Sequence, residues 1–121
     1  MSNLDIGKIG EDISCEYIKK KLARKILYRN YRSVRWGEID IISVKDNEIF
    51  FTEVKTRTSL RYGNPDEAIS FYKMKSLRRA INYFLTHEGE QYQKFAYNIE
   101  FVGIILNPKS KKIEQFDHLV M

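Results

Sequence analysis

The fold is decided by the stretch GEIDIISVKDNEIFFTEVK, which covers residues 37–55. Two apolar runs rich in β-branched and aromatic residues flank the polar cluster Lys45-Asp46-Asn47-Glu48, a pattern typical of two strands joined by a tight turn. Close to the turn both runs are apolar on both faces, as in strands that are covered on two sides. The stretch therefore predicts a central β-hairpin with helices on either side of it.

The register of this hairpin follows from the position of its turn. If the turn is centred between Asp46 and Asn47, residues whose numbers sum to 93 face each other, so Asp40 lies opposite Glu53. The Cβ atoms of directly opposed residues are about 4.5–5.5 Å apart, and like charges at that distance destabilise a sheet. Two opposed carboxylates therefore indicate a nearby cation. Strand alternation places Lys55 on the same face as Glu53.

A set of surface ion pairs is the alternative interpretation of these charges. The same register places Glu38 opposite Lys55, and such a pair needs no metal. It leaves unexplained why Asp40 faces Glu53, because neither carboxylate neutralises the other. The chain has only one cysteine and two histidines, so any metal would be held mainly by oxygen, which favours Mg²⁺ or Mn²⁺.

A helix expected over Asp5–Leu22 carries a further acid. At about 100° per residue, its apolar residues form two adjacent stripes, and most of its charged residues gather on the remaining arc. Glu11 falls instead within the less polar arc. Because an unpaired buried charge is costly, Glu11 either has a partner on the core side or lies at the edge of the stripe, where it reaches water or Lys8. The pattern leaves both possibilities open.

The remaining segments predict further strands and a second helix. We expect a short strand or irregular segment at Ile26–Arg35, a helix at Phe71–Thr86, a strand at Tyr97–Leu106 and a closing strand at Lys111–Phe116. The order helix, strands, helix, strands predicts an α/β fold with a central sheet flanked by helices. A chain of 121 residues is expected to form a single domain, residues 1–121.

Basic residues are concentrated in one part of the chain. The formal net charge is +5, and the segment from Lys19 to Arg35, both included, contains eight basic residues and no acidic one. Such a block indicates a polyanionic partner such as nucleic acid, or else a solvated face that serves only solubility. On the first interpretation we expect nucleic-acid contacts from five basic residues of this block, of the segment after the hairpin and of the second helix: Arg32, Arg35, Arg57, Lys73 and Lys75.

Features of export and membrane insertion are missing from the sequence. No apolar run approaches the roughly 18 residues of a membrane span, and the N-terminus lacks the apolar region of a signal peptide. Cys15 is the single cysteine, so an intramolecular disulfide is impossible, which fits a reducing compartment. We therefore expect a cytoplasmic protein without a membrane partner.

Five motifs spread over the chain resemble those of the YraN family of small bacterial proteins. They are Gly7-x-x-Gly10-Glu11, Asn30-Tyr31-Arg32, Gly37-Glu38-Ile39-Asp40-Ile41-Ile42, Glu53-Val54-Lys55-Thr56-Arg57 and Gly63-x-Pro65-x-Glu67-Ala68-Ile69. That family is similar to the archaeal-type Holliday junction resolvases, and the resemblance implies their restriction-endonuclease-like fold, in which helices flank a central mixed β-sheet. The chain departs from the family at Asn98-Ile99-Glu100, where Arg-Phe-Asp is common.

The resemblance also implies a nuclease site. Asp40 with Glu53-x-Lys55 corresponds to the PD-(D/E)xK signature of the nuclease superfamily, and Glu11 corresponds to its helix-borne acid. Asp40, Glu53 and Glu11 would then hold Mg²⁺ or Mn²⁺, while Lys55 orients the attacking water or stabilises the extra charge on phosphorus. Glu38 would tune Lys55. The implied function is that of a metal-dependent DNA endonuclease that acts on branched or structured DNA. By analogy with the resolvases, we also expect a homodimer.

Two other classes of function fit the same residues. A nucleic-acid-binding protein could keep the nuclease fold and bind DNA without cutting it, and a scaffold protein could use its basic surface to meet an acidic partner. An intact set of Asp40, Glu53 and Lys55 favours the enzyme. The sequence contains no dedicated base-reading module, which favours recognition of DNA structure over DNA sequence.

Overall fold

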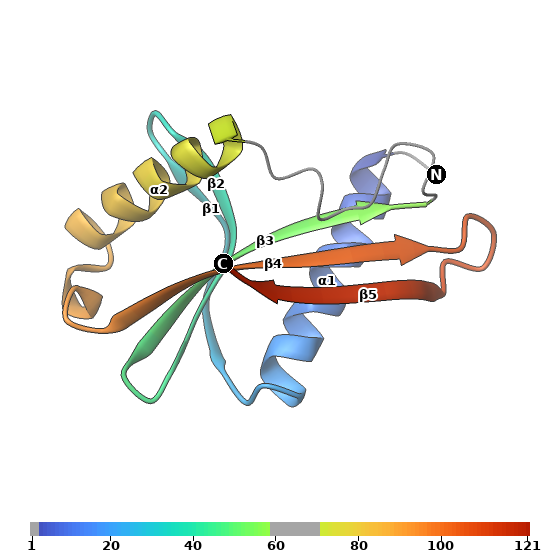
Figure 1. Cartoon of the computed structure of the whole chain (residues 1–121), viewed down its shortest axis with the longest axis horizontal. Coiled ribbons are helices and arrows are strands. Elements are labelled where there is room, and N and C mark those ends of the chain that lie inside the picture. The colour runs from blue at the N-terminus through green and yellow to red at the C-terminus, as the bar shows by residue number, and fades with distance from the viewer. Residues whose placement is uncertain (1–2, 59–70) are drawn as a thin grey trace.

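The computed structural model describes residues 3–58 and 71–121. The elements in this part of the chain are, in order, α1 (Asn3–Lys20), β1 (Lys25–Ser33), β2 (Gly37–Lys45), β3 (Glu48–Arg57), α2 (Phe71–Thr86), the short 3₁₀ helix η3 (Glu90–Tyr92), β4 (Ala96–Leu106) and β5 (Ile113–Val120) (Figure 1). The motif at residues 63–69 lies outside the described residues.

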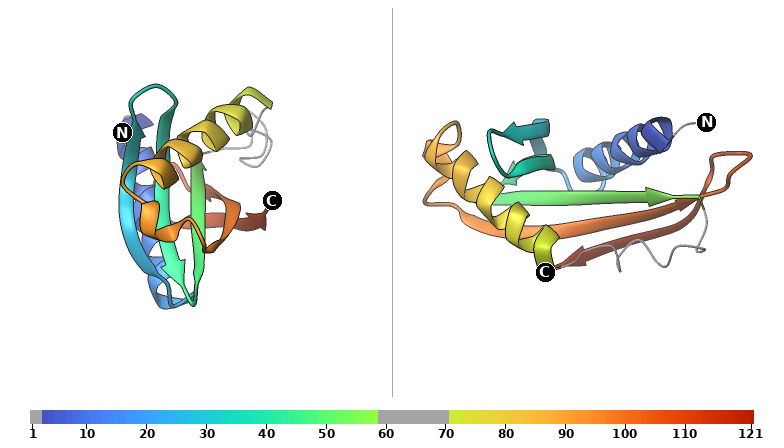
Figure 2. Two further views of the ribbon diagram at one scale, coloured as in Figure 1. Left: turned by 90° about the vertical axis from the view of Figure 1, so that its left-hand side faces the viewer. Right: turned by 90° about the horizontal axis from the view of Figure 1, so that it is seen from above.

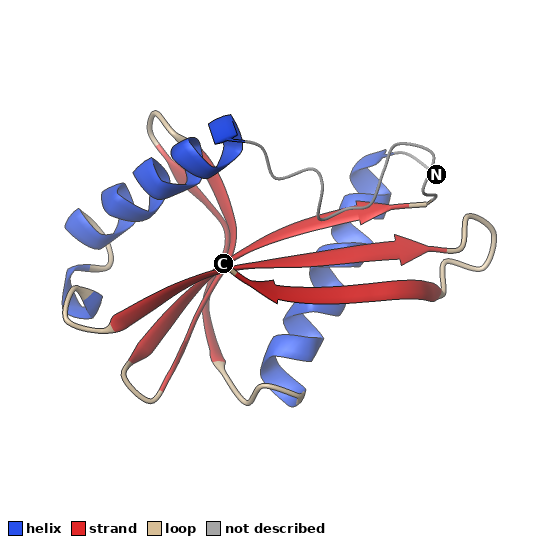
Figure 3. Cartoon of the chain, in the orientation of Figure 1, coloured by secondary structure: helices blue, strands red, loops and turns tan. Residues whose placement is uncertain are grey.

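Within the described residues, five strands form one mixed sheet in the order β1-β2-β3-β4-β5. β3 and β4 are parallel, and the chain between them passes through α2 and η3, whereas the other neighbouring strands are antiparallel. The sheet and its two longer helices are distinguished by colour in Figure 3. The expectation of an α/β fold with a central mixed sheet flanked by helices is therefore confirmed for these residues.

The hairpin register is confirmed where the ladder is formed. Ile42 pairs with Phe51 and Val44 with Ile49. The turn residues Asp46 and Asn47 have φ angles of 48° and 64°. Positive φ at both central residues is typical of the type I′ turn, whose twist matches that of the strands it joins. A local turn preference thus sets which residues of β2 and β3 face each other.

Helices cover opposite faces of the sheet, as the left panel of Figure 2 shows. On the α2 side, apolar residues of β1, β2, β3 and β4 pack with those of the helix: Tyr31, Ile39, Ile42, Ile49, Phe51, Leu77, Ala80, Ile81, Phe84 and Ile99. On the α1 side, two smaller clusters join helix residues, among them Cys15 and Ile18, to residues of β2, β3 and β4: Ile41, Val54, Val102, Ile104 and Leu106. Neither helix of the described residues is long and apolar enough to cross a membrane.

The first strand takes one of the two forms left open by the sequence, whereas the last strand departs from its predicted bounds. The segment expected to be a short strand or irregular is a strand of nine residues, β1, with a register shift between Ile26 and Tyr28. The closing strand β5 begins later than predicted and runs further. The reason is the turn before it, where the Asn107 side chain accepts hydrogen bonds from the N–H groups of Lys109 and Ser110 at 2.9 and 3.0 Å.

Close contact between α1 and β3 depends on Gly10. A Cβ atom at this position would lie 1.7 Å from Thr56 Oγ1, whereas a Cβ atom at Gly7 would meet nothing within 4 Å. The missing side chain therefore lets the helix backbone approach the strand. Because Glu11 follows Gly10 directly, this approach also sets where Glu11 stands relative to the sheet.

Substituting these two glycines should have opposite effects. Gly10→Ala should lower the free energy of unfolding by roughly 1–3 kcal/mol, because the new methyl group forces helix and strand apart. Gly7→Ala should raise it by up to about 1 kcal/mol, because alanine favours a helix and meets no neighbour here. Urea denaturation of both variants measures the two changes. Equal effects at both positions would contradict the close approach at Gly10.

Candidate functional site

Two buried or half-buried carboxylates meet where the β2–β3 ladder ends. The ladder stops with Ile41 opposite Thr52. One residue further, the carboxylate of Asp40 accepts a hydrogen bond of 2.7 Å from the backbone N–H of Val54. The adjacent Glu53 is only 6% exposed. A side chain thus bonds to the β3 backbone just beyond the ladder, and this brings the predicted pair, Asp40 and Glu53, into the same site.

The environment of Asp40 disfavours its charged form. Burial, followed by the negative charge of Glu53, raises the pKa of Asp40 from its ordinary 3.8 to about 7. The hydrogen bond from Val54 and the positive charge of Lys73 act in the opposite direction but do not outweigh them. A carboxyl group poised near neutrality beside a second carboxylate is a common feature of functional sites, since a structural ion pair would lower the pKa.

The two carboxylate oxygens of Glu53 have different environments. Oε1 lies 2.9 Å from the Lys73 ammonium of α2. Oε2 is buried and has no hydrogen-bond partner among the described residues. A buried carboxylate oxygen without a partner carries a desolvation cost, so an unpaired one deserves a functional explanation. Oxygen donors of this kind suit Mg²⁺ or Mn²⁺.

Glu11 stands beside the pair rather than within it. Burial and the charge of Asp40 raise the pKa of Glu11, while a hydrogen bond with the side chain of Asn30 and the charge of Arg29 oppose this shift. The Arg29 guanidinium lies 4.0 Å from the Glu11 carboxylate and donates a hydrogen bond of 2.6 Å to Asp12. Of the two possibilities left open by the sequence, the structure favours polar partners next to the site over water and Lys8.

Asn30 is a site residue that the helix and strand patterns did not single out. It lies in the middle of β1, yet its φ is 52°, in the left-handed region. The register places Arg29 opposite Ile41 and Tyr31 opposite Ile39, so Asn30 comes level with Asp40. Asparagine tolerates this backbone better than most residues. The available sequence signal was an asparagine interrupting a run with strand character.

The lysine that contacts Glu53 is Lys73, which the sequence predicted to contact nucleic acid. Lys55 is half-buried on β3, where it pairs with Gly103 of β4, and no ion pair involves it within residues 3–58 and 71–121. The pKa of Lys73 is raised: burial alone would lower it, but the hydrogen bond to Glu53 and the charges of Glu53 and Asp40 outweigh burial. The role predicted for Lys55 stays a prediction.

The prediction that Glu38 pairs with Lys55 is wrong. Glu38 accepts a hydrogen bond of 2.8 Å from Arg32 on β1, the residue directly opposite it. The physical reason is the geometry of the sheet: the ladder with β3 ends at Ile41, before Glu38 could come level with Lys55, whereas the ladder with β1 continues past Glu38. Tuning of Lys55 by Glu38 through such a pair therefore has no basis in this geometry.

The residues predicted to bind nucleic acid occupy different settings. Arg35 and Lys75 are exposed, Arg32 is exposed but paired with Glu38, and Arg57 is half-buried with a buried Nε that has no hydrogen-bond partner in the described part of the chain. Arg35 and Lys75 are therefore the members of this set most accessible to a phosphate. The contacts themselves stay a prediction.

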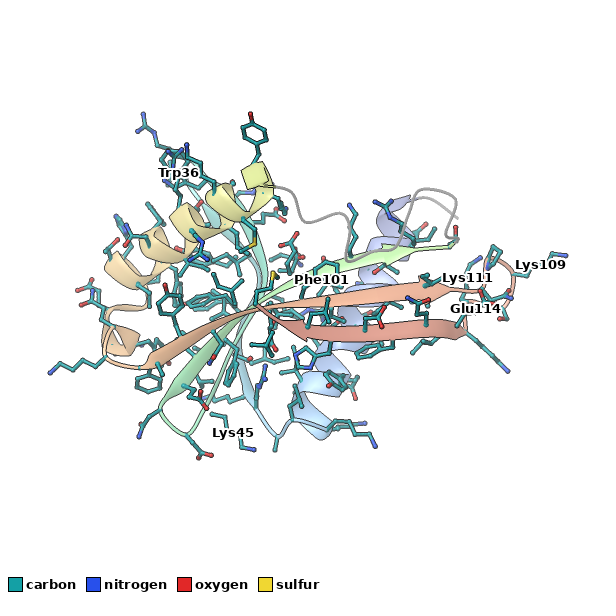
Figure 4. All side chains as sticks on the ribbon, viewed as in Figure 1. Trp36, Lys45, Phe101, Lys109, Lys111 and Glu114 are labelled. Carbon is teal, nitrogen blue, oxygen red and sulfur yellow. The ribbon has the colours of Figure 1, made fainter. Side chains whose placement is uncertain are left out.

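The turn between β1 and β2 contacts α2 through Trp36. Ser76 donates a hydrogen bond of 2.5 Å to the carbonyl oxygen of Trp36, and the Arg79 guanidinium lies 4.5 Å from the Trp36 ring centre. Trp36 lies against α2 in Figure 4. Because Lys73 lies on the same helix, these contacts help to hold the first turn of α2 over the carboxylates.

A second buried polar cluster surrounds Glu100 of β4. Glu100 is 1% exposed and accepts hydrogen bonds from Arg24 and, at 2.9 Å, from Thr52. His118 of β5 also contacts this carboxylate, and its other ring nitrogen lies 3.0 Å from the Tyr17 hydroxyl. The sequence pointed to this position only as a departure from the family pattern. The cluster joins β4 to the segment after α1, and within the described residues no hydrogen bond or ion pair links it to Asp40 or Glu53.

The carboxylate pair fits a divalent cation only in part. Residues 3–58 and 71–121 contain no group of three or more His, Cys, Asp or Glu side chains placed to hold a metal ion. Glu11 therefore does not complete a three-ligand group with Asp40 and Glu53 as the side chains stand. The buried, unpaired oxygen of Glu53 and the raised pKa of Asp40 nevertheless suit an oxygen-rich site whose other ligands would be main-chain carbonyls, water or phosphate.

Fold and site together define a small α/β protein with a buried acidic pair at the end of its central hairpin. Comparison with known proteins gives its family: the sequence profile described as "Uncharacterised protein family UPF0102" matches residues 10–118. The chain belongs to this family, which is the YraN family.

Relatives with the same family name cover nearly the whole chain. The chain is 37% identical to the UPF0102 protein of Caldanaerobacter subterraneus over 116 residues, which are 95% of this chain and 91% of that protein. It is 41% identical to that of Chloroherpeton thalassium over 110 residues, 91% of this chain and 82% of that protein. For Dictyoglomus thermophilum the identity is 36% over 120 residues, 99% and 98% of the two chains. The resemblance drawn from the motifs is confirmed.

Proposed function

We propose that this protein is a divalent-metal-dependent DNA endonuclease with a restriction-endonuclease-like fold. The observation that carries the proposal is the acidic pair. Asp40 and Glu53 interact in a buried site, the pKa of Asp40 is raised to about 7, and one oxygen of Glu53 has no hydrogen-bond partner in the described residues. Such an arrangement costs stability in the absence of a cation, so a binding role explains it better than a structural one.

The residues around the pair suit phosphodiester hydrolysis. Asp40 and Glu53 would hold Mg²⁺ or Mn²⁺ through oxygen. When bound there, a divalent cation polarises the phosphoryl group and lowers the pKa of a nearby water. Lys55 would stabilise the extra negative charge on phosphorus, and Glu11, anchored next to Asn30, would hold a water of the outer shell. Exposed basic residues such as Arg35 and Lys75 would bind the backbone phosphates on either side.

Branched or otherwise structured DNA is the proposed substrate, and a homodimer the proposed working form. Support for both comes from the likeness of the family motifs to the archaeal-type resolvases. A DNA-binding protein that keeps the fold without cutting is the second candidate. The observation that favours it is the ion pair between Lys73 and Glu53, because a lysine already neutralises part of the acidic site.

The test is cleavage of labelled duplex, flap and four-way junction DNA in Mg²⁺ or Mn²⁺, with EDTA as the blank. The unmodified protein should cut branched substrates in a metal-dependent manner. Glu53→Gln should reduce the rate at least ~100-fold, because the chemistry supplied by the cation is worth several kcal/mol and each 1.36 kcal/mol is a factor of about ten. Glu16→Gln, a change of the same charge at an exposed position of α1, should leave the rate unchanged.

Binding should separate from cutting. Glu53→Gln should still bind DNA, with an affinity that falls as salt rises, because phosphate contacts release counterions. If the unmodified protein binds in this way but cuts none of the substrates, the second candidate is correct. A salt-independent affinity would remove the argument from phosphate contacts.

A further inference from the structure

Lys73 contacts Glu53, one member of the acidic pair, from outside the sheet. It lies in the first turn of α2, its side chain is 46% exposed, and its ammonium is 2.9 Å from Oε1 of a Glu53 side chain that is 8% exposed. The contact therefore joins a buried carboxylate to a lysine with access to solvent. Lys73 belongs neither to the hairpin nor to the Glu53-x-Lys55 motif, so the strand pattern does not account for it.

The contact gives the acidic group a positive charge at close range. The negative charges of Asp40 and Glu38 add to that of Glu53 in raising the pKa of Lys73. Two like charges near each other in a buried setting require compensation. In this structure Lys73 supplies the compensating positive charge. It pairs with Oε1 of Glu53, while Oε2 of the same carboxylate has no hydrogen-bond partner among the described residues.

A divalent cation bound to the same pair would meet this ammonium. Both are positive, both would bind Glu53, and charges about 4 Å apart in a partly buried site interact strongly. Strong simultaneous binding of both to one carboxylate is therefore unfavourable. Because its side chain is partly exposed, Lys73 can turn toward solvent, whereas Glu53 on the central strand cannot.

We propose that Lys73 takes the place of the cation in the metal-free protein and must leave Glu53 when a divalent metal binds. The proposal rests on the metal site of the proposed function. It makes Lys73 a competitor of the metal, in contrast to Lys55, whose predicted role is with the phosphate. The displaced ammonium remains at the edge of the site, where a DNA phosphate would offer it a new partner.

The test measures Mn²⁺ binding to the whole 121-residue chain by isothermal titration calorimetry at pH 8, without DNA. Lys73→Met removes the ammonium and keeps an aliphatic side chain. Lys75→Met makes the same change of net charge two residues further along α2, at an exposed position. We expect Lys73→Met to bind Mn²⁺ at least about tenfold more tightly than the unmodified protein, and Lys75→Met to stay within about twofold of it. Adding Glu53→Gln to Lys73→Met should abolish the gain.

Thermal unfolding gives a second readout. In EDTA, Lys73→Met should unfold at a lower temperature than Lys75→Met, because Glu53 and Asp40 lose their compensating charge. Saturating Mn²⁺ should then raise the unfolding temperature of Lys73→Met by more than that of the unmodified protein. If Lys73→Met does not fold, Lys73→Gln carries the same expectations.

Two results would overturn the competition. One is Mn²⁺ binding by Lys73→Met that is equal to or weaker than that of Lys75→Met, which would make Lys73 neutral or helpful to the metal. The other is a lack of Mn²⁺ binding by every variant. Neither measurement involves cleavage, so a protein that shows the expected ratio but cuts no DNA would refute the nuclease proposal and support the competition.

Discussion

Asp40→Asn is expected to stabilise the metal-free protein by up to about 4 kcal/mol at pH 8. The folded protein raises the pKa of Asp40 from 3.8 to about 7, and each pH unit of difference is worth about 1.36 kcal/mol. At pH 8 the carboxylate is charged in both states, and the folded state bears the cost of burying it beside Glu53. Asparagine has no charge to bury and can still accept the hydrogen bond from Val54.

The advantage of Asp40→Asn should shrink as the pH falls. A group with a raised folded-state pKa binds more protons in the folded state, so the unmodified protein gains stability on acidification from about pH 7 toward pH 4. At pH 5 the difference between the two proteins should be below about 2 kcal/mol. Urea denaturation in EDTA at both pH values measures it.

Asp12→Asn is the matched control for this experiment. Asp12 is exposed and accepts a hydrogen bond of 2.6 Å from Arg29, so its substitution should cost at most about 1 kcal/mol and should not stabilise the protein at pH 8. The proposed function adds that Asp40→Asn abolishes cleavage, so that stability and activity change in opposite directions. A loss of stability at pH 8 on Asp40→Asn would show that the carboxylate is structural.

Glu100→Gln is expected to be among the most destabilising substitutions, at roughly 3–5 kcal/mol. It keeps the size of the side chain but removes the charge that compensates Arg24, whose side chain is 9% exposed and whose guanidinium lies 3.5 Å from the Phe50 ring centre. An uncompensated buried guanidinium is the main cost. The contacts of Glu100 with His118 and Thr52 weaken as well.

Chemical denaturation of four variants, Glu16→Gln, Glu100→Gln, Arg24→Met and the double variant of the last two, separates this charge effect from packing. Glu16→Gln removes an exposed carboxylate that pairs with Lys20 at 2.8 Å, and it should lower the free energy of unfolding far less than Glu100→Gln, because solvent screens an exposed pair. Adding Arg24→Met to Glu100→Gln removes the uncompensated charge and should restore part of the loss. If the double variant is as unstable as the sum of its single substitutions, the two side chains do not act as a pair.

Much of the fold follows from local patterns. The hairpin turn at Asp46 and Asn47, the bounds of α2 and the approximate bounds of α1 and β4 agree with the predictions. These features depend on turn chemistry and on the spacing of apolar residues within one segment. β5 begins later than predicted because the Asn107 side chain accepts hydrogen bonds from the N–H groups of Lys109 and Ser110, and composition alone does not reveal these bonds.

The sequence by itself determined the acidic pair and the family. Asp40 and Glu53 belong to one hairpin, whose turn and two-residue period place them next to each other just beyond the last ladder pair, where Asp40 accepts a hydrogen bond from Val54. The motifs along the chain identify the UPF0102 family. Only the tertiary structure decided which charged residues surround them. Lys73 reaches Glu53 through the packing of α2 over the sheet, and Arg24 reaches Glu100 across 76 positions of the chain. Contacts of this kind depend on how segments that are far apart in the sequence pack against each other. The spacing of apolar residues within one segment does not encode which side chains of two segments will meet.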